Sequence, residues 1–326
     1  MAQKLPDSFI SCDWGTSRLR LRYVEVPSMT VRGEAISDQG ISKTFEMWEK
    51  DGEPGGRIDF FAGILRKELQ GLKDFAPNLS SAELPIICSG MASSSLGIET
   101  VPYARLPYAL DGSRATVSKV TSGILPNPLF LIGGIQGRDD VMRGEETELL
   151  GIASLINSLP DNFLAILPGT HSKHIQVTKG RITGFDTFMT GELFMMLREH
   201  GTLSHSLKIR DRPHWESFEK GAMLALDKPL LNALFRVRVN DLLGTLTKEQ
   251  NYDFLSGLLI GTEVSHLKER AGIHLVLMGG TAHLDYYKRA VAFLGLNEQL
   301  NCIGGPLSDL AAIHGQWLIY QKFVQE

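Results

Sequence analysis

An apolar strand that breaks at a Gly-Thr turn occurs twice in this chain, and this repeat is the feature that most constrains the fold. The first copy covers residues 8–13 and breaks at Trp14-Gly15-Thr16-Ser17. The second copy covers residues 162–167 and breaks at Pro168-Gly169-Thr170-His171-Ser172. Two copies of one strand and turn indicate an internal duplication. We therefore expect two halves with the same order of elements.

The hydrophobic pattern of each half predicts that order. In the first half, it predicts strands at 8–13, 18–26 and 31–36, a helix at 58–72 and a strand at 84–88. In the second half, it predicts strands at 162–167, 174–178 and 181–185, a helix from Thr190 to Gly201 and a strand at 273–278. Further helices are expected at 145–158 and 308–322. Both halves therefore follow the order β-β-β-α-β.

Composition excludes several classes of protein. With 33 Lys and Arg against 37 Asp and Glu in 326 residues, the formal net charge is −4, and 43% of residues are hydrophobic. These values are typical of a globular protein and argue against nucleic acid as the main partner, because phosphate binding needs a concentrated basic face. The three cysteines form no CxxC pair, so neither a disulfide framework nor a zinc site is expected. No apolar run is long enough for a signal core or a membrane span, and a cytoplasmic location is expected.

The glycine turns favour phosphate binding. Glycine lets another group approach the backbone closely, and consecutive N–H groups in such a turn form a concave anion site. A carboxylate beside a phosphate, as Asp13 would be, requires a divalent cation between them, and Mg²⁺ is the usual choice. An ordinary hairpin turn capped by Asp13 is the alternative for one such turn, but the second copy favours two turns that hold a polyphosphate. The chain contains no GxxxxGK[ST] loop, so a P-loop kinase is excluded.

Five segments of the chain together resemble the 2-keto-3-deoxygalactonate kinases, within the superfamily of actin, sugar kinases and Hsp70. These segments are residues 13–20, 134–147, 167–174, 188–194 and 255–261. The resemblance implies an α/β protein of two RNase H-like β-β-β-α-β domains with the actin-like ATPase fold and an interdomain cleft. We expect the domains at 1–155, with the substrate and the first phosphate turn, and at 156–326, with the second phosphate turn and the adenosine site. It also implies ATP-dependent phosphorylation of a sugar acid at a terminal hydroxyl, in galactonate degradation.

The resemblance and the turns assign roles to particular residues. Those expected around the nucleotide are Asp13, Gly15, Thr16, Arg18, Gly169, Thr170, His171, Gly279 and Gly280, with Asp13 also holding Mg²⁺. Those expected near the sugar acid are Ser89, Gly90, Ser94, Arg143, Thr190 and Glu192. Thr190 could equally be a plain helix cap. The pair Met195-Met196 is expected in the core.

A base for the substrate hydroxyl is expected at the start of the helix that follows Gly144. Glu145 lies four residues before Leu149, so it should point toward the buried side, where a carboxylate is costly without a role. Glu146 is the equal alternative, and Asp140 is the next candidate. Complementing the helix dipole is the competing role for both glutamates. Two rival functions share these features, namely a phosphohydrolase of the same superfamily and a non-catalytic module that senses ATP or a sugar acid.

The chain departs from the family pattern after Ser89-Gly90-Met91. The family typically continues with a Gly-Ser-Arg stretch and an aromatic residue near the sugar acid, whereas this chain continues with Ala92-Ser93-Ser94-Ser95-Leu96-Gly97-Ile98. Serine hydroxyls supply donors but no charge, so another cation must bind the carboxylate. Arg143 and Arg105 are the nearest candidates in the sequence. We expect weaker use of 2-keto-3-deoxygalactonate than is usual in the family, or preference for a related sugar acid or neutral sugar.

Overall fold

The computed structural model describes residues 5–51, 56–76, 79–270 and 272–325. Its contacts divide the chain into two units. The first unit comprises Met1–Leu159, Gly180–Gly184 and Leu307–Glu326, and the second comprises Pro160–Lys179 and Phe185–Pro306. The expected division after residue 155 lies close to the end of the first of these stretches. The C-terminal stretch differs from the expected division, because it belongs to the first unit.

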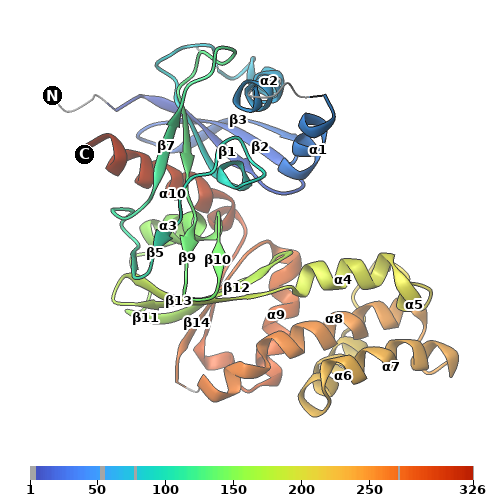
Figure 1. Ribbon diagram of the computed structural model, residues 1–326. Helices are drawn as coiled ribbons and strands as arrows, with labels where there is room; N and C mark the ends of the chain where they lie inside the picture. The colour runs from blue at the N-terminus through green and yellow to red at the C-terminus, as the bar shows by residue number, and fades with distance from the viewer. Residues whose placement is uncertain (1–4, 52–55, 77–78, 271, 326) are drawn as a thin grey trace. The chain divides into compact units, whose positions relative to one another are not determined.

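The first unit is built on a six-stranded sheet with the order β3-β2-β1-β4-β8-β7 (Figure 1). Its strands are β1 (Ser8–Trp14), β2 (Leu19–Glu25), β3 (Thr30–Ser37), β4 (Ile86–Gly90), β7 (Val117–Val120) and β8 (Leu129–Ile132). The hairpins β1–β2 and β2–β3 are antiparallel, whereas β1, β4 and β8 run parallel. A smaller sheet has the order β10-β9-β5, formed by β5 (Ala104–Arg105), β9 (Ile135–Gln136) and β10 (Val141–Met142).

Helices cover both faces of the larger sheet. On one face α1 (Ile41–Asp51) and α2 (Arg57–Leu69), with η1 (Gln70–Leu72) and η2 (Met91–Ser93), add side chains to a core that includes Trp14, Phe61 and Leu65. On the other face lie α3 (Glu145–Leu155) and α10 (Pro306–Gln325), where Phe9 of β1 stacks on Trp317 of α10. The end of the chain therefore completes the core of the first unit.

The second unit repeats the strand order of the first. Its sheet runs β13-β12-β11-β14-β15, which matches β3-β2-β1-β4-β8 strand for strand. These strands are β11 (Asn162–Leu167), β12 (Ser172–Thr178), β13 (Arg181–Phe188), β14 (His274–Met278) and β15 (Leu300–Ile303). As in the first unit, the first hairpin is antiparallel and the next two pairings are parallel. The topology thus confirms the predicted duplication. The first residues of β13 belong to the first unit, where they pair with β6 (Tyr108–Ala109).

The helices of the second unit pack mainly on one another, and α9 also contacts β14 and β15. These helices are α4 (Thr190–Glu199), α5 (Gly201–Ser204), α6 (Trp215–Asp227), α7 (Leu230–Leu242), α8 (Lys248–Val264), η3 (Ser265–Arg270), α9 (Thr281–Phe293) and η4 (Asn297–Gln299). The glycines of the 255–261 segment explain how α6 and α8 cross so closely. A Cβ added to Gly257 would lie 1.9 Å from the carbonyl oxygen of Phe218. Only glycine permits that approach, which brings α8 against α6.

Within the described residues, no helix combines the length and the apolar character needed to cross a bilayer. The thiols of Cys12, Cys88 and Cys302 are free. Cys12 and Cys88 face each other on the neighbouring parallel strands β1 and β4.

Candidate active site

The carboxyl ends of β1 and β4 lie close to the start of α3, which carries the predicted bases Glu145 and Glu146. Asp13 pairs with Ser89 in the parallel ladder, and both strands end one residue later. Gly90 has φ +88, and a Cβ added there would lie 3.6 Å from Oδ1 of Asp13. A Cβ on Gly144, which has φ +112, would lie 3.3 Å from Cα of Gly90. The two glycines therefore let the start of α3 approach the carboxylate of Asp13.

Four acidic side chains share this part of the first unit. Burial raises the pKa of Asp13, the charge of Glu145 adds to the rise, and Arg20 and Arg22 oppose it. Burial and then Glu145 raise the pKa of Glu146 to about 7. Burial raises the pKa of Glu148 to about 8, and the charges of Asp13, Glu145 and Glu146 add to this rise. Carboxylates that hinder one another's ionisation form a site suited to a cation.

Glu148 and Arg20 are members of this group that the sequence analysis missed. Glu148 follows Glu145 by three residues, so both lie on one side of α3. Arg20 lies directly opposite Asp13 in the β1–β2 ladder, and its charge lowers the pKa of both Asp13 and Glu148. The spacing of the glutamates and the length of the hairpin are the sequence signals from which both positions could be found.

Glu145 and Glu146 differ in what their carboxylates contact. Glu146 is 1% exposed, and its two oxygens accept the Gly144 N–H at 3.0 and 2.8 Å. Its Oε1 also accepts the Thr147 hydroxyl at 3.1 Å. Glu145 is only partly buried, accepts the Arg143 N–H at 3.0 Å and acts electrostatically on Asp13. Glu145 therefore suits a reacting hydroxyl better, whereas Glu146 is bound to the start of its own helix.

The third candidate base lies outside this group. Asp140 is on the turn between β9 and β10, where its Oδ1 accepts the Val141 N–H at 2.7 Å. Its carboxylate therefore stabilises the turn between β9 and β10.

The first predicted phosphate turn joins β1 to β2 above the same sheet edge. The Gly15 N–H donates to the Arg18 carbonyl at 2.9 Å, which closes the turn. The carbonyls of Gly15 and Thr16 accept the N–H groups of Ile41 and Ser42 at 3.0 and 3.1 Å. The turn is thus held by the start of α1, and the side chains of Thr16 and Arg18 are exposed.

Three of the predicted substrate residues of the first unit, Ser89, Gly90 and Ser94, lie at the end of β4 or in the loop that follows it, and Arg143 contacts that loop. Ser89 is buried, and its Oγ accepts a hydrogen bond from Nε2 of Gln316 on α10 at 2.9 Å. Ser94 is buried, and its Oγ accepts the Leu96 N–H at 3.2 Å. Arg143 donates to Ser93 Oγ at 2.6 Å, and its guanidinium lies 4.3 Å from the ring centre of Tyr103. The buried side of the loop is therefore held by a hydrogen bond from the Arg143 guanidinium to Ser93.

The second predicted phosphate turn lies at the carboxyl end of β11 in the second unit. Gly169, Thr170 and His171 are exposed there. The Glu192 N–H donates to the Thr170 carbonyl at 2.9 Å, and a Cβ on Gly191 would lie 2.4 Å from the Gly169 carbonyl oxygen. The start of α4 thus touches the turn directly.

Glu192 and Thr190, which were expected near the sugar acid, lie beside this second turn. The carboxylate of Glu192 is hydrogen-bonded to the ring of His171. Both residues belong to the second unit, whereas Ser89, Gly90, Ser94 and Arg143 belong to the first.

A buried carboxylate supports the second turn from beneath. Glu263 of α8 is 2% exposed and accepts hydrogen bonds from Ser172 at 2.6 Å and from Tyr287 at 2.7 Å. His174 lies 2.9 Å from the same carboxylate, and Thr190 bonds to it as well. Burial raises the pKa of Glu263, but the hydrogen bond and charge of His174 outweigh it, so the pKa is lowered. Glu263 thus joins α8 to the turn and to the start of α4.

A cavity of about 550 Å³ in the second unit opens beside this turn. Pro168, Gly169 and Thr170 form part of its wall, and helices α4, α8 and α9 supply apolar and aromatic side chains such as Phe194, Ile260 and Tyr286. Gly279, which precedes Gly280, lies next to this wall, because a Cβ on Gly279 would lie 3.6 Å from Pro168. The glycines expected near adenosine and the second turn are therefore close together in space.

Two basic side chains of this cavity are among the residues that the sequence analysis missed. Arg198 is hydrogen-bonded to Tyr252. Arg210 forms an ion pair of 2.6 Å with the fully buried Asp253 and lies 4.9 Å from the ring centre of Tyr252. Tertiary packing places these two arginines in the wall of the cavity. No local sequence pattern therefore identifies them as cavity residues.

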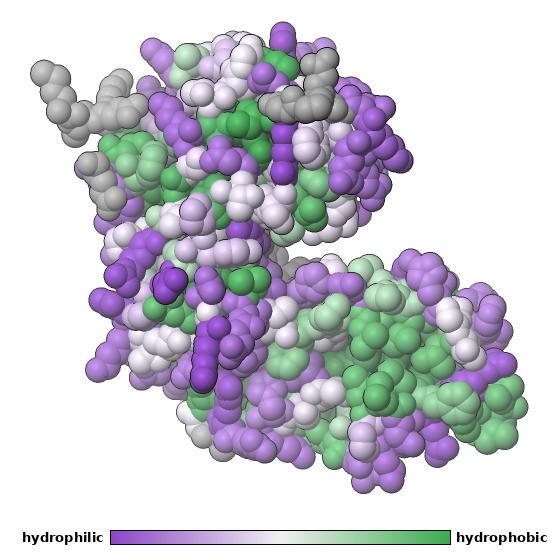
Figure 2. Space-filling model, viewed as in Figure 1, coloured by the Kyte–Doolittle hydropathy of each residue, from purple (hydrophilic) through white to green (hydrophobic). Residues whose placement is uncertain are grey.

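One expectation for the second unit is wrong. Met195 and Met196, expected in the core, are 40% and 53% exposed. They lie on α4, which carries no fully buried residue among those described. Figure 2 shows a wide apolar area on the helical part of the second unit. The apolar face of α4 is directed partly to solvent and partly, through Met195, to the cavity.

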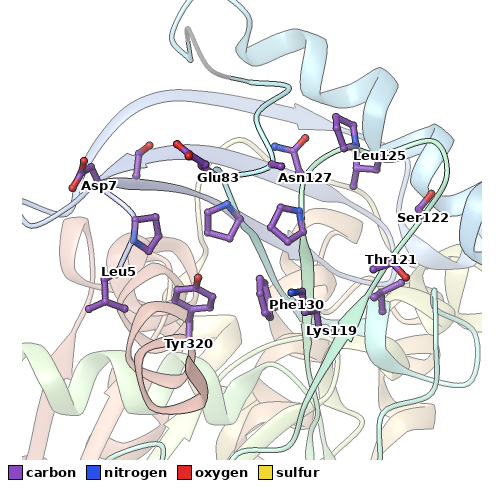
Figure 3. A pocket seen from close by; sticks show the side chains of 17 residues that line it. Leu5, Asp7, Glu83, Lys119, Thr121, Ser122, Leu125, Asn127, Phe130 and Tyr320 are labelled. Carbon is purple, nitrogen blue, oxygen red and sulfur yellow. The ribbon is translucent and has the colours of Figure 1, made fainter. Parts of the chain in front are cut away.

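A second cavity, of about 740 Å³, occupies the opposite edge of the first unit's sheet (Figure 3). It is lined where β1, β4 and β8 begin, by residues such as Ser8, Pro85, Pro128 and Tyr320. Because ligands of parallel α/β sheets bind beyond the carboxyl ends of the strands, this cavity is not the catalytic one.

No three His, Cys, Asp or Glu side chains within the described part of the chain are close enough to share a metal ion. The chemistry at Asp13 nevertheless fits Mg²⁺, since its carboxylate is an oxygen ligand with a raised pKa among other acids. Mg²⁺ in nucleotide sites usually takes one or two carboxylates and completes its shell with water and phosphate.

The family model for 2-keto-3-deoxy-galactonokinase matches residues 13–317 of this chain. The chain belongs to the 2-keto-3-deoxy-galactonokinase family. The resemblance found in the sequence is thereby confirmed. The 2-dehydro-3-deoxygalactonokinase of Escherichia coli (strain K12) is 33% identical over 235 residues, which cover 70% of this chain and 77% of that protein. A probable 2-dehydro-3-deoxygalactonokinase of Rhizobium meliloti (strain 1021) is 33% identical over 302 residues, 89% of this chain and 90% of that protein.

Solved structures confirm the fold. A crystal structure from Sinorhizobium meliloti, of a protein assigned as 2-dehydro-3-deoxygalactonokinase, has a TM-score of 0.78 and 29% identity and covers 97% of this chain and 99% of that one. Component A of (R)-2-hydroxyglutaryl-CoA dehydratase from Acidaminococcus fermentans has a TM-score of 0.51 with 13% identity, covering 98% of this chain and 99% of that one. The predicted fold class, actin-like ATPase halves of β-β-β-α-β order, is confirmed.

Proposed function

We propose that this chain transfers the γ-phosphoryl group of ATP to a terminal hydroxyl of 2-keto-3-deoxygalactonate. The observation that carries the proposal is the match to the galactonokinase family over residues 13–317, which spans both Gly-Thr turns and the acidic start of α3. Relatives that bear the name 2-dehydro-3-deoxygalactonokinase support the choice of sugar acid. The serine-rich loop after β4 does not weaken the proposal, because other cations of the first unit reach that loop.

In this proposal, Asp13 holds Mg²⁺ directly or through water. Mg²⁺ bound there supplies positive charge against the β- and γ-phosphates. The role fits the position of Asp13 at the end of β1, where its carboxylate is crowded by Glu145 and Glu148 and its pKa is raised by burial. Gly15 and Thr16 offer backbone and hydroxyl donors to a phosphate in the first unit.

Glu145 acts as the base that orients and deprotonates the attacking hydroxyl. It is the more accessible of the paired glutamates and acts on Asp13, whereas Glu146 is enclosed at its helix start. Phosphoryl transfer asks little more of the protein than alignment and charge stabilisation.

In the second unit, the exposed Gly169-Thr170-His171 turn binds phosphate oxygens. The start of α4 and the buried Glu263 hold that turn in place. The neighbouring 550 Å³ cavity, with its aromatic wall, takes the adenosine. Free thiols, such as those of Cys12 and Cys88, are typical of the reducing cytosol, where ATP is available for the reaction.

The test is ADP release by the purified protein with MgATP, with and without 2-keto-3-deoxygalactonate. Release that depends on the sugar acid supports the kinase. Release at the same rate without it would identify a phosphohydrolase instead. Binding of ATP or of the sugar acid without ADP release would identify a sensing module.

A further inference from the structure

The proposed substrate carries a carboxylate, and the loop after β4 has no cation of its own. Residues 91–98 contain serines and apolar residues but neither lysine nor arginine. A carboxylate taken out of water needs a cation or several strong donors, because leaving it unpaired costs several kcal/mol. The positive charge must therefore come from another element of the first unit.

A guanidinium from a different element contacts the exposed side of this loop. Arg57 opens α2, and its Nη2 donates to the carbonyl oxygen of Ser95 at 2.6 Å. Ser95 itself is exposed, so this contact lies at the accessible side of the loop. Arg143 reaches the same loop from its buried side, at Ser93.

Aromatic rings hold the guanidinium of Arg57 in position. Its Cζ lies 5.3 Å from the ring centre of Phe45, 5.2 Å from that of Trp48 and 5.8 Å from that of Phe61. Phe61 in turn packs on Trp14, the residue after Asp13, at 5.8 Å between ring centres. Rings against the faces of a guanidinium leave its N–H edge as the part that binds a ligand. The rings also connect Arg57 to the end of β1.

Arg57 has no acidic partner among the described residues. None of their carboxylates lies within ion-pair distance of it, and its Nε is buried without an acceptor there. Burial lowers the pKa of Arg57, which reflects a charge partly removed from water. By contrast, Arg22, Arg32 and Arg210 each pair with a carboxylate. Among the described residues, Arg57 is thus a positioned cation without a carboxylate partner.

The two arginines suggested by the sequence are less suited to this role. Arg143 spends its N–H groups on Ser93 and the Val101 carbonyl and stacks on Tyr103. Arg105 is exposed on β5, where Ala104 and Arg105 pair with β9 of the smaller sheet. Neither combines an accessible guanidinium with contact to the exposed side of the loop.

We propose that Arg57 binds the carboxylate of the sugar acid and thereby selects acids over neutral sugars. The inference rests on the proposed function, since it names the group that recognises the substrate of that reaction. The fork of the guanidinium matches a carboxylate in two parallel hydrogen bonds, with Ser95 Oγ as a neighbouring donor.

The test compares wild type with Arg57→Met, which keeps an apolar stem among the rings and removes the charge. We expect KM for 2-keto-3-deoxygalactonate to rise about 10- to 100-fold, as for the loss of a charge-assisted pair, while KM for ATP stays unchanged. The methyl ester of the sugar acid should be a poor substrate for wild type, and its KM should not change in the variant. Arg66→Met, an exposed arginine of the same helix, is the matched control and should behave as wild type.

The ester separates recognition from a purely structural role. If Arg57 only held the loop through Ser95, KM would rise for acid and ester alike, and the inference would be overturned. An unchanged KM for the acid in a folded Arg57→Met protein would overturn it too, while leaving the kinase intact. Arg57→Lys keeps the charge without the fork and should raise KM for the acid by a smaller factor. Absence of turnover of the sugar acid by wild type would instead overturn the proposed function, and the inference with it.

Discussion

The carboxylates clustered around Asp13 destabilise the folded protein, and this destabilisation indicates a functional role. Asp13, Glu145, Glu146 and Glu148 stand close enough that burial and mutual repulsion raise the pKa of three of them. The charges of Arg20 and Arg22 partly offset this repulsion at Asp13, and Arg20 does so at Glu148. Such clustering destabilises the chain alone and becomes favourable when a cation is bound.

Asp13→Asn tests the metal role of Asp13 at nearly constant size. We expect kcat to fall about 100-fold or more, because the charge that would hold Mg²⁺ opposite the phosphates is lost. The Mg²⁺ concentration needed for half-maximal activity should rise as well. Steady-state kinetics across a Mg²⁺ series measure both, and circular dichroism checks the fold. Wild-type turnover in a folded variant would leave Asp13 with only a structural role.

Glu145→Gln and Glu146→Gln, made separately, distinguish the two candidates for the base. Glu145→Gln should lower kcat by about 100-fold or more while the affinity for ATP stays near that of wild type, because a base does not touch the phosphates. Glu146→Gln should reduce kcat much less, since that carboxylate is bound to Gly144 and Thr147. Equal and mild effects of both substitutions would favour the helix-dipole role instead.

Glu148 makes stability depend on pH. Its pKa is raised from 4.5 to about 8 in the folded state. Below about pH 4.5 both states are protonated there. As pH rises toward 8, the unfolded chain releases this proton while the folded chain keeps it, so the free energy of unfolding falls, by an amount on the order of a few kcal/mol. Above pH 8 the loss is complete.

Urea unfolding at pH 5 and pH 8, without Mg²⁺, measures this effect. Glu148→Gln should reduce the dependence, because the amide does not titrate, and the part that remains comes from Glu146, whose pKa is raised to about 7. Glu216→Gln, which removes an exposed carboxylate of α6, is the control and should leave the slope unchanged. The same slope in wild type and Glu148→Gln would show that Glu148 is already ionised in the folded protein.

At the scale of elements, the sequence predicts the strands well and the helical layers poorly. The hairpins and the buried parallel strands have clear periods, so β1 to β4 and β11 to β14 lie where expected. Helix α1 was not predicted, although Ile41, Phe45 and Trp48 have helical spacing, because only a narrow side of it is apolar. The short strands β5, β6, β9 and β10 consist of two residues each, too few to show any period.

The same limit applies to the candidate site. Residues in the turns, and the acids that open α3, are close to a recognisable local pattern, so the sequence identifies them. Arg57, Arg210 and Glu263 acquire their roles from contacts with distant segments, namely Ser95, Asp253 and Ser172. The spacing of residues along the sequence does not indicate such contacts.

The contact between α4 and the second turn gives a prediction at the scale of one element. In Gly191→Ala, the added Cβ would lie 2.4 Å from the Gly169 carbonyl oxygen, so the start of α4 or the turn must shift. We expect KM for ATP to rise about 10-fold or more, with a smaller change in KM for the sugar acid. Gly63→Ala on α2, where no atom lies within 4 Å of the added Cβ, is the control. An unchanged KM for ATP would separate α4 from phosphate binding.

At the scale of the whole molecule, the first unit is built from both ends of the chain. The C-terminal helix α10 lies against α3 and against the face of the first sheet. Gln316 donates to the Cys12 carbonyl and to Ser89 Oγ, at 2.9 Å in each case, one residue before Asp13 and Gly90. The helix that ends the chain therefore supports the strands that carry the site.

The crossing of α3 and α10 depends on two glycines and yields the prediction at this scale. A Cβ on Gly315 would lie 1.8 Å from the Thr147 carbonyl oxygen, and one on Gly151 would lie 1.7 Å from the Ala311 carbonyl oxygen. Backbone atoms cannot move aside as the end of a flexible side chain can. The added Cβ of Gly315→Ala must therefore move the two helices apart. We expect the free energy of unfolding to fall by about 1–3 kcal/mol or more, as for an overpacked core.

Activity should fall together with stability in Gly315→Ala, because α3 carries Glu145 and any shift of that helix displaces the carboxylate from Asp13. A misplacement of about 1 Å costs on the order of 100-fold in rate. Urea unfolding and kcat, both at a temperature where the variant is fully folded, measure the two effects. Gly63→Ala should be neutral or slightly stabilising, since alanine favours a helix over glycine. A Gly315→Ala protein that is less stable but fully active would show that α10 closes the first unit without setting the geometry of its site.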